Sequence, residues 1–286
     1  MSTAGWKYYN HAMISDLAPH QNVDLTSIEN REMWENRGGK NPLFARWTSD
    51  FDCGFETNWW YCIKDTPLDI SKLKSKKRYE INKGKKNFEA KIIEDECLVE
   101  EIINISLEVW QNYPKTYRPN FSSNELKKSF KSMIENESYK VIGAFDRNDN
   151  KLCSYAVLKE HSEYVDFQML KSKPSKEKYG VNAAMICYIC ELYKDKLSKE
   201  FYICDGERNV SHATFFQEYL EKYFEFRKAY CKIHISYNPK IKFIVQCLYP
   251  IRKILWKFDD IRMLHNVGAV LKMEEYIRES SNLERL

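Results

Sequence analysis

Side chains that can exchange protons gather in the second half of the chain. Asp205 ends the apolar run YICD, Asp166 lies in the run YVDFQML (164–170), and His212 follows a little later. A carboxylate or an imidazole in such a position can act as a general base. We rank Asp205 first, because layered sheets bind ligands beyond the carboxyl ends of their strands, then Asp166, then His212. The alternatives are a structural carboxylate at Asp205 and a capping or surface histidine.

The loop SKPSKEKYGVNAAM (172–185) has the composition of an anion site. Gly180 permits a close approach of the backbone, and the helix expected after it starts with unpaired N–H groups that favour a phosphate. The candidate binding residues are Lys176, Lys178, Tyr179, Gly180, Val181 and Asn182. The alternative is an ordinary loop glycine that precedes a core helix.

Positive charge is concentrated in residues 74–87, KSKKRYEINKGKKN. This run holds seven Lys or Arg against a single Glu, in a chain whose net charge is only +4. A general nucleic-acid patch normally lies in a more basic chain and interleaves its charges with exposed aromatics. We therefore expect a short basic helix over 72–84. Its cations either face a phosphorylated substrate or form a solvated surface; those we select are Arg78, Lys83 and Lys86.

Composition and cysteine usage suit a cytoplasmic protein with a sizeable core. The 286 residues fit one large domain or two modest ones, and 45 basic residues nearly balance 41 acidic ones. The first residues show no secretory signal, and no apolar window approaches a membrane span. Nine scattered cysteines indicate free thiols in a reducing compartment. Cys187 and Cys190 form a CxxC inside an apolar helix, so we expect core packing and no metal.

Residues 248–264, LYPIRKILWKFDDIRML, form an aromatic and basic amphipathic segment that is broken at Pro250. A segment of this kind can rest on a membrane surface. The alternative is packing against the protein's own sheet.

Apolar periodicity and turn signals predict an α+β fold. We expect a loop-rich extension over 1–87 with a strand at 55–64, a main domain over 88–237, and a helical tail over 238–286. In the main domain the strands fall at 88–93, 139–145, 151–158, 164–170, 201–206 and 226–237. Helices begin after Asp95, at a Ser122/Glu125 capping box, at Val181 and near His212.

This element order, with a polar loop and a glycine between the fourth strand and its helix, resembles the GNAT acyltransferase superfamily over 88–237. A closer resemblance is to the Fem-type, polysaccharide-cluster branch. It rests on LKSKKRYEINKGKK before the first strand and on YICDGERNVSHATFFQEYLEKYFEFRKAYCKIHISYNP at the end, and with these flanks it spans Trp59 to Leu255. It implies a mixed, mainly antiparallel sheet with helices on both faces.

The resemblance also implies an activity: transfer of an acyl group from a thioester donor to an amine. The donor would be acetyl-CoA or another acyl-CoA, not tightly bound, with its pyrophosphate on the loop around Gly180. Registering the family pattern places its catalytic tyrosine on Leu220, so Tyr219 or Tyr223 would protonate the leaving thiolate, or else pack. The acceptor would be an amino sugar or a nucleotide sugar of surface-polysaccharide synthesis.

Two other functions stay open. One is a Fem-like transferase that uses charged tRNA; Fem enzymes generally carry two GNAT-like halves, and residues 1–87 are too few for a complete first half. The other is a GNAT fold kept as a non-catalytic binding module. The sequence does not indicate an oligomeric state.

Overall fold

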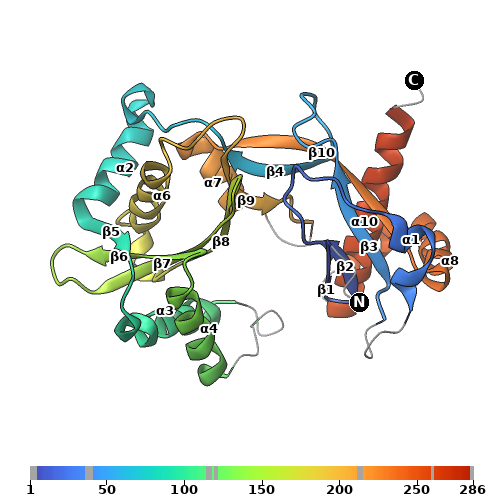
Figure 1. Cartoon of the computed structure of the whole chain (residues 1–286), viewed down its shortest axis with the longest axis horizontal. Coiled ribbons are helices and arrows are strands. Elements are labelled where there is room, and N and C mark those ends of the chain that lie inside the picture. The colour runs from blue at the N-terminus through green and yellow to red at the C-terminus, as the bar shows by residue number, and fades with distance from the viewer. Residues whose placement is uncertain are drawn as a thin grey trace. The chain divides into compact units, whose positions relative to one another are not determined.

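The computed structural model describes residues 5–35, 41–113, 118, 122–210, 215–258 and 261–283. The chain forms two compact units (Figure 1). The first contains residues 1–61, 207–214 and 228–286, and the second contains residues 62–206 and 215–227. The predicted helix start near His212 lies outside the described residues.

The second unit is built on a mixed sheet. Its strands are β5 (Phe88–Ile92), β6 (Tyr139–Asp146), β7 (Leu152–Glu160), β8 (Tyr164–Ser172) and β9 (Tyr202–Glu207). They pair in this order, and only β8 and β9 run parallel. The meander predicted for β6 to β8 is present, and the unit is α+β with mainly antiparallel pairing.

Neighbouring residues on these strands pack into different hydrophobic clusters, because side chains alternate across a pleated sheet. Ile142 packs with residues of α6, whereas Val141 packs with residues of α3 and α4. Figure 1 shows α3 and α4 on one side of this sheet and α2 and α6 on the other. The helices are α2 (Ser75–Asn87), α3 (Val99–Gln111), α4 (Ser123–Glu135), α5 (Pro174–Glu177), α6 (Val181–Leu192) and α7 (Phe215–Phe224).

Local signals set several of these helix starts as expected. Ser122 and Glu125 form the predicted capping box of α4. The Asp95 carboxylate accepts a hydrogen bond from the backbone N–H of Cys97 at 2.8 Å, in the turn that leads into α3. α2, in contrast, runs through Gly84 to Asn87, beyond the predicted end.

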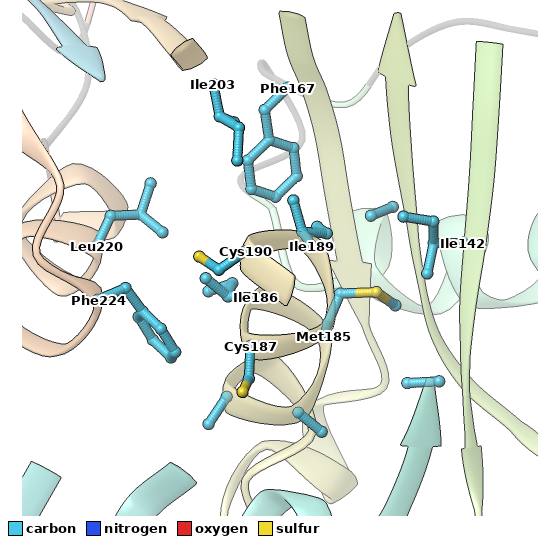
Figure 2. Close-up of a cluster of buried hydrophobic side chains, with 14 of the residues drawn as sticks. Ile142, Phe167, Met185, Ile186, Cys187, Ile189, Cys190, Ile203, Leu220 and Phe224 are labelled. Atoms are coloured by element: carbon cyan, nitrogen blue, oxygen red, sulfur yellow. The ribbon is translucent and has the colours of Figure 1, made fainter. Parts of the chain in front are cut away.

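Cys187 and Cys190 lie in the hydrophobic cluster of α6 (Figure 2), as predicted for core cysteines. Burial raises the pKa of the Cys190 thiol to about 12, so it stays protonated. Among the described residues no group of His, Cys, Asp or Glu side chains could hold a metal ion.

The first unit has its own strands, three of them within the first fifty residues, where the sequence predicted none. β1 (Trp6–Tyr9), β2 (Ala12–Ser15), β3 (Phe44–Ser49) and β10 (Arg227–Tyr237) pair in this order. β1 and β2 are short and join through a two-residue turn, Asn10 and His11, both with positive φ. Strands of four residues carry too little alternation to stand out in a sequence.

The remaining elements of this unit include α1 (Thr26–Glu29) and a helical end to the chain: α8 (Pro239–Leu248), α9 (Arg252–Leu255) and α10 (Arg262–Leu283). β4 (Trp59–Lys64) contributes its first three residues here and its last three to the second unit. In the described part of the chain, no helix combines the length and apolar character needed to cross a bilayer.

Candidate active site

β8 and β9 diverge at the centre of the candidate site. Their pairing covers Tyr164 to Asp166 on β8 and Tyr202 to Cys204 on β9. Beyond these residues β8 continues to Ser172 while pairing with β7 on its other edge. Asp205 is the first residue of β9 past the last pair, so it lies where the two strands separate. A splayed edge of this kind presents backbone N–H groups that can hold a developing oxyanion.

Asp205 meets a glutamine of α7. The Gln217 side chain, 7% exposed, donates a hydrogen bond to the Asp205 carboxyl. Asp166, opposite Cys204 in the strand register, is near enough for its charge to act on Asp205. Gln168 Nε2 donates to Asp166 Oδ2 at 3.0 Å. The structure thus brings together the two carboxylates ranked first and second, with Gln217 as a partner that the sequence did not suggest.

The Asp205 carboxyl loses its proton at a higher pH than an ordinary aspartate. Burial raises its pKa to about 8, against the hydrogen bond from Gln217, which lowers it; the Asp166 charge raises it further. A group whose pKa lies close to the working pH can both accept and return a proton efficiently. A perturbed carboxyl of this kind is typical of functional sites, although structural networks also produce it.

Tyr219 and Tyr223 lie one turn apart on α7, with ring centroids 5.1 Å apart. Burial, followed by the negative charge of Glu80 and by Tyr223, raises the pKa of Tyr219, so its hydroxyl keeps its proton. Tyr219 and Gln217 are two positions apart, about 200° around the helix axis. The tyrosines and Asp205 are therefore on different sides of α7.

Gly180 starts α6 in the left-handed conformation, with φ +88°, and its open side is filled by α2. A Cβ atom placed on Gly180 would lie 2.9 Å from the backbone nitrogen of Gly84. Val181 and Ala183 are almost fully buried. One side of the first turn of α6 is therefore closed by α2, and the two glycines permit that close crossing.

Other residues of the predicted anion loop have structural partners. Lys176 Nζ lies 2.7 Å from Asp146 Oδ2, which raises the Lys176 pKa, and Asn182 Oδ1 accepts a hydrogen bond from Ser172 Oγ. The Tyr179 carbonyl accepts from Asn87 Nδ2 at 3.0 Å. Lys178 lies exposed over the Tyr179 ring, 5.1 Å from its centroid.

The cations selected on α2 are spread around the helix. Arg78 is exposed and donates to the Ser71 carbonyl at 2.9 Å. Lys83 pairs with Glu80 at 3.5 Å, and Lys86 is exposed. Lys83 and Lys86 are three positions apart and share a side, whereas Arg78 and Lys83 point in different directions.

Comparisons with known proteins were made on the sequence and on the structure. No family model and no curated protein matches the chain. Among solved structures, FemX matches 86% of this chain and 85% of its own, with a TM-score of 0.55 and 7% identity. L-PGS from Bacillus licheniformis matches 84% and 82%, with a TM-score of 0.48 and 12% identity.

A PaiA N-acetyltransferase from Thermoplasma acidophilum, solved in complex with coenzyme A, matches 38% of this chain and 73% of its own, with a TM-score of 0.32 and 19% identity. The match to FemX covers more residues of this chain than either unit contains by itself. The chain shares the fold of FemX, and the resemblance inferred from the sequence is confirmed at the level of fold.

Proposed function

We propose that this chain, which has a Fem-type GNAT fold, is an N-acyltransferase that moves an acyl group from an activated donor to an amine. One observation carries the proposal: Asp205 lies at the point where β8 and β9 separate, and burial raises its pKa to about 8. A carboxyl held there can exchange a proton with an amine while the open strand edge accommodates the acyl carbon.

The reaction requires three tasks, and we assign each of them to groups of this chain. Ionised Asp205 removes the amine proton, directly or through water, and Gln217 stabilises the carboxylate by donating to it. Backbone N–H groups beyond Asp166 on β8 hold the oxyanion. Tyr219, whose pKa is raised, keeps a proton that it can give to the leaving group. The amine and the leaving group are bonded to the same acyl carbon, so this role requires the Tyr219 hydroxyl to reach past α7 to the carbon that Asp205 serves.

An acyl-CoA is the first candidate donor, and the fold similarity to acetyltransferases supports it. The start of α6 does not fit as the cradle for its pyrophosphate, because Gly84 fills the open side of Gly180 and Val181 is buried. We therefore derive no step through coenzyme A. Lys178 is the exposed cation of this loop that stays available for a phosphate.

A charged tRNA is the second candidate donor, and two observations favour it. The Cα side of Gly180, where coenzyme A would need a close approach of the backbone, is closed by Gly84. The first unit is assembled from both ends of the chain, so the part of the protein outside the second unit is larger than its amino-terminal residues alone. The short amino-terminal part is therefore not an argument against a Fem-like arrangement.

The acceptor we propose is an amine on an amino sugar or a nucleotide sugar of surface-polysaccharide synthesis. Support for a phosphorylated substrate comes from the exposed cations on α2, Arg78 and Lys86. Opposite charge at an entrance steers a phosphorylated ligand and lowers its KM.

The experiment that tests the function supplies each donor with each acceptor. Purified protein is incubated with acetyl-CoA or with a mixture of aminoacyl-tRNAs, together with nucleotide-linked amino sugars, and products are identified by mass spectrometry. Product from either donor that disappears in Asp205→Asn supports the proposal. Saturable donor binding without product, in wild type and variant alike, would identify a non-catalytic binding module instead.

The contribution of the basic helix is tested separately. We expect Arg78→Ala or Lys86→Ala to raise the KM of one phosphorylated substrate several-fold without changing kcat. Lys199→Ala, another exposed lysine of the same unit, is the matched control. An unchanged KM for every substrate would mean that these cations are only a solvated face.

A further inference from the structure

Large apolar side chains are exposed at an unusual density near the end of the first unit. Seven of the sixteen exposed large hydrophobic residues in the described part of the chain fall between residues 243 and 263, with exposed fractions of 44% to 70%. They form what we call the tail face: Phe243, Ile244, Ile251, Ile254, Phe258, Ile261 and Met263. Large apolar side chains that are exposed along one segment of the chain indicate an interaction site.

Contacts with α10 on one side of residues 249–256 leave the other side of this segment facing solvent. Trp256 Nε1 donates to the Gly268 carbonyl of α10 at 3.3 Å, and Arg252 lies 2.9 Å from Glu275 of the same helix. The Arg278 guanidinium stacks over the Tyr249 ring, 3.8 Å from its centroid. Polar and aromatic anchors therefore bind residues 249–256 to α10, whose position at the end of the chain is visible in Figure 1.

Those anchors leave aliphatic and aromatic residues on the solvent side. Between Tyr249 and Phe258, the exposed large apolar residues are Ile251, Ile254 and Phe258. This is the reverse of an ordinary surface turn, in which the apolar residues would pack inward.

Positive charge is interleaved with the tail face. Lys240, Lys242, Lys253 and Lys257 are exposed beside it; residues 239–258 contain no acidic residue, and Asp259 and Asp260 follow them in the sequence. Exposed apolar side chains among lysines are complementary to a membrane surface, where anionic headgroups cover an apolar interior. In a symmetric contact with a second copy, the same lysines would face each other and repel.

We propose that the tail face docks on the surface of a bilayer that contains anionic phospholipid. Ile254 and Phe258 insert between headgroups, and the flanking lysines contact lipid phosphates. The segment lies along the surface and does not cross, because its helical turns are short and interrupted by Pro250. The docking does not depend on the proposed reaction, since it is measured without substrate.

The test is sedimentation of the full chain with vesicles. We expect binding to vesicles of phosphatidylcholine mixed with phosphatidylglycerol, weak binding to phosphatidylcholine alone, and loss of binding at high salt. The double variant Ile254→Ser/Phe258→Ser should weaken binding to anionic vesicles at least tenfold. Lys253→Gln/Lys257→Gln should weaken it several-fold and reduce its salt dependence.

Matched controls separate docking from misfolding. Phe55→Ser removes an aromatic ring that is 56% exposed elsewhere in the same unit, and Lys199→Gln removes an unrelated positive charge. Both should bind vesicles like the wild type, and all variants should keep their thermal midpoints. Equal binding by every variant, or no binding to anionic vesicles, would overturn the proposal. So would a dimer in light scattering that Ile254→Ser dissociates, since the occupant would then be a second copy.

Discussion

Gly84 and Gly180 meet backbone to backbone: a Cβ atom on Gly84 would lie 2.4 Å from the carbonyl oxygen of Gly180. The contact joins α2 to the first turn of α6, and Asn87 extends it by donating to the Tyr179 carbonyl. The basic helix is thus a structural neighbour of the predicted anion loop. A glycine that looked suited to a phosphate is used for helix packing.

The first prediction concerns this contact. Replacing an internal helix glycine by alanine normally stabilises a helix by about 1 kcal/mol. For Gly84→Ala we expect the opposite, a loss of about 1 to 3 kcal/mol in the free energy of unfolding, because the methyl group meets backbone atoms that cannot rotate away. Thermal and urea unfolding measure the change. Asn82→Ala on the exposed side of α2 is the control and should be neutral or slightly stabilising.

The second prediction is a pair of opposite shifts in the pH profile. Gln217→Met removes a hydrogen bond that favours the ionised Asp205, so the pKa should rise above about 8 and activity at neutral pH should fall. Asp166→Asn removes a negative charge that disfavours ionisation, so the pKa should fall. The measurement is kcat/KM against pH, which reports the free enzyme.

Asp205→Asn is the reference variant for the pH profiles of Gln217→Met and Asp166→Asn. It should lower kcat/KM by roughly 10² to 10⁴ and remove the rise near pH 8. A profile that keeps its shape in all three variants would exclude Asp205 as the base.

The third prediction separates the two tyrosines of α7. If Tyr219 protonates the leaving group, Tyr219→Phe should lower kcat with little change in KM, since the ring packing is kept. Tyr223→Phe, which changes the adjacent ring of the pair, should have a smaller effect. Equal small losses in both variants would assign the pair to packing alone.

The fourth prediction decides what Lys176 does. In the structure its ammonium is paired with Asp146, 2.7 Å away, and the hydrogen bond to Lys176 holds the pKa of that carboxyl below its usual range. For a purely structural pair, Lys176→Met and Asp146→Asn should both leave the KM of the donor unchanged. A selective rise of that KM in Lys176→Met would instead show that the lysine reaches the donor.

The fifth prediction concerns Lys64, a lysine of β4 with no exposed surface. Burial lowers the pKa of its ammonium, so between the folded value and about 10.5 the unfolded chain binds more protons and stability rises with pH. Lys64→Met should therefore raise the free energy of unfolding at neutral pH by about 1 to 4 kcal/mol. The gain should shrink as the pH approaches 10.5. A loss of stability at neutral pH would show that the contacts to Thr66 and the Glu225 carbonyl outweigh the cost of burial.

Prediction from the sequence worked where the signal is local. The Ser122/Glu125 capping box, the Asp95 turn and the strands of the meander depend on residues a few positions apart, and they form as expected. The two short strands at the amino terminus were missed, because strands of four residues show little periodicity. Gln217 was missed as well; its only signal was a polar residue at helical spacing from Leu220 and Phe224, which are buried with it on α7.

The sequence by itself determined the elements of the second unit, the ranking of Asp205 among the carboxylates and the resemblance that led to acyl transfer. Only the tertiary structure decided which of these residues meet. It brings Asp205 to Gln217 and Asp166, closes Gly180 against Gly84, and turns Ile254 and Phe258 outward. The reason is physical. The periodicity of a helix or strand depends on residues that are close in the sequence, whereas a pKa, a helix crossing and an exposed face depend on groups that only folding brings together.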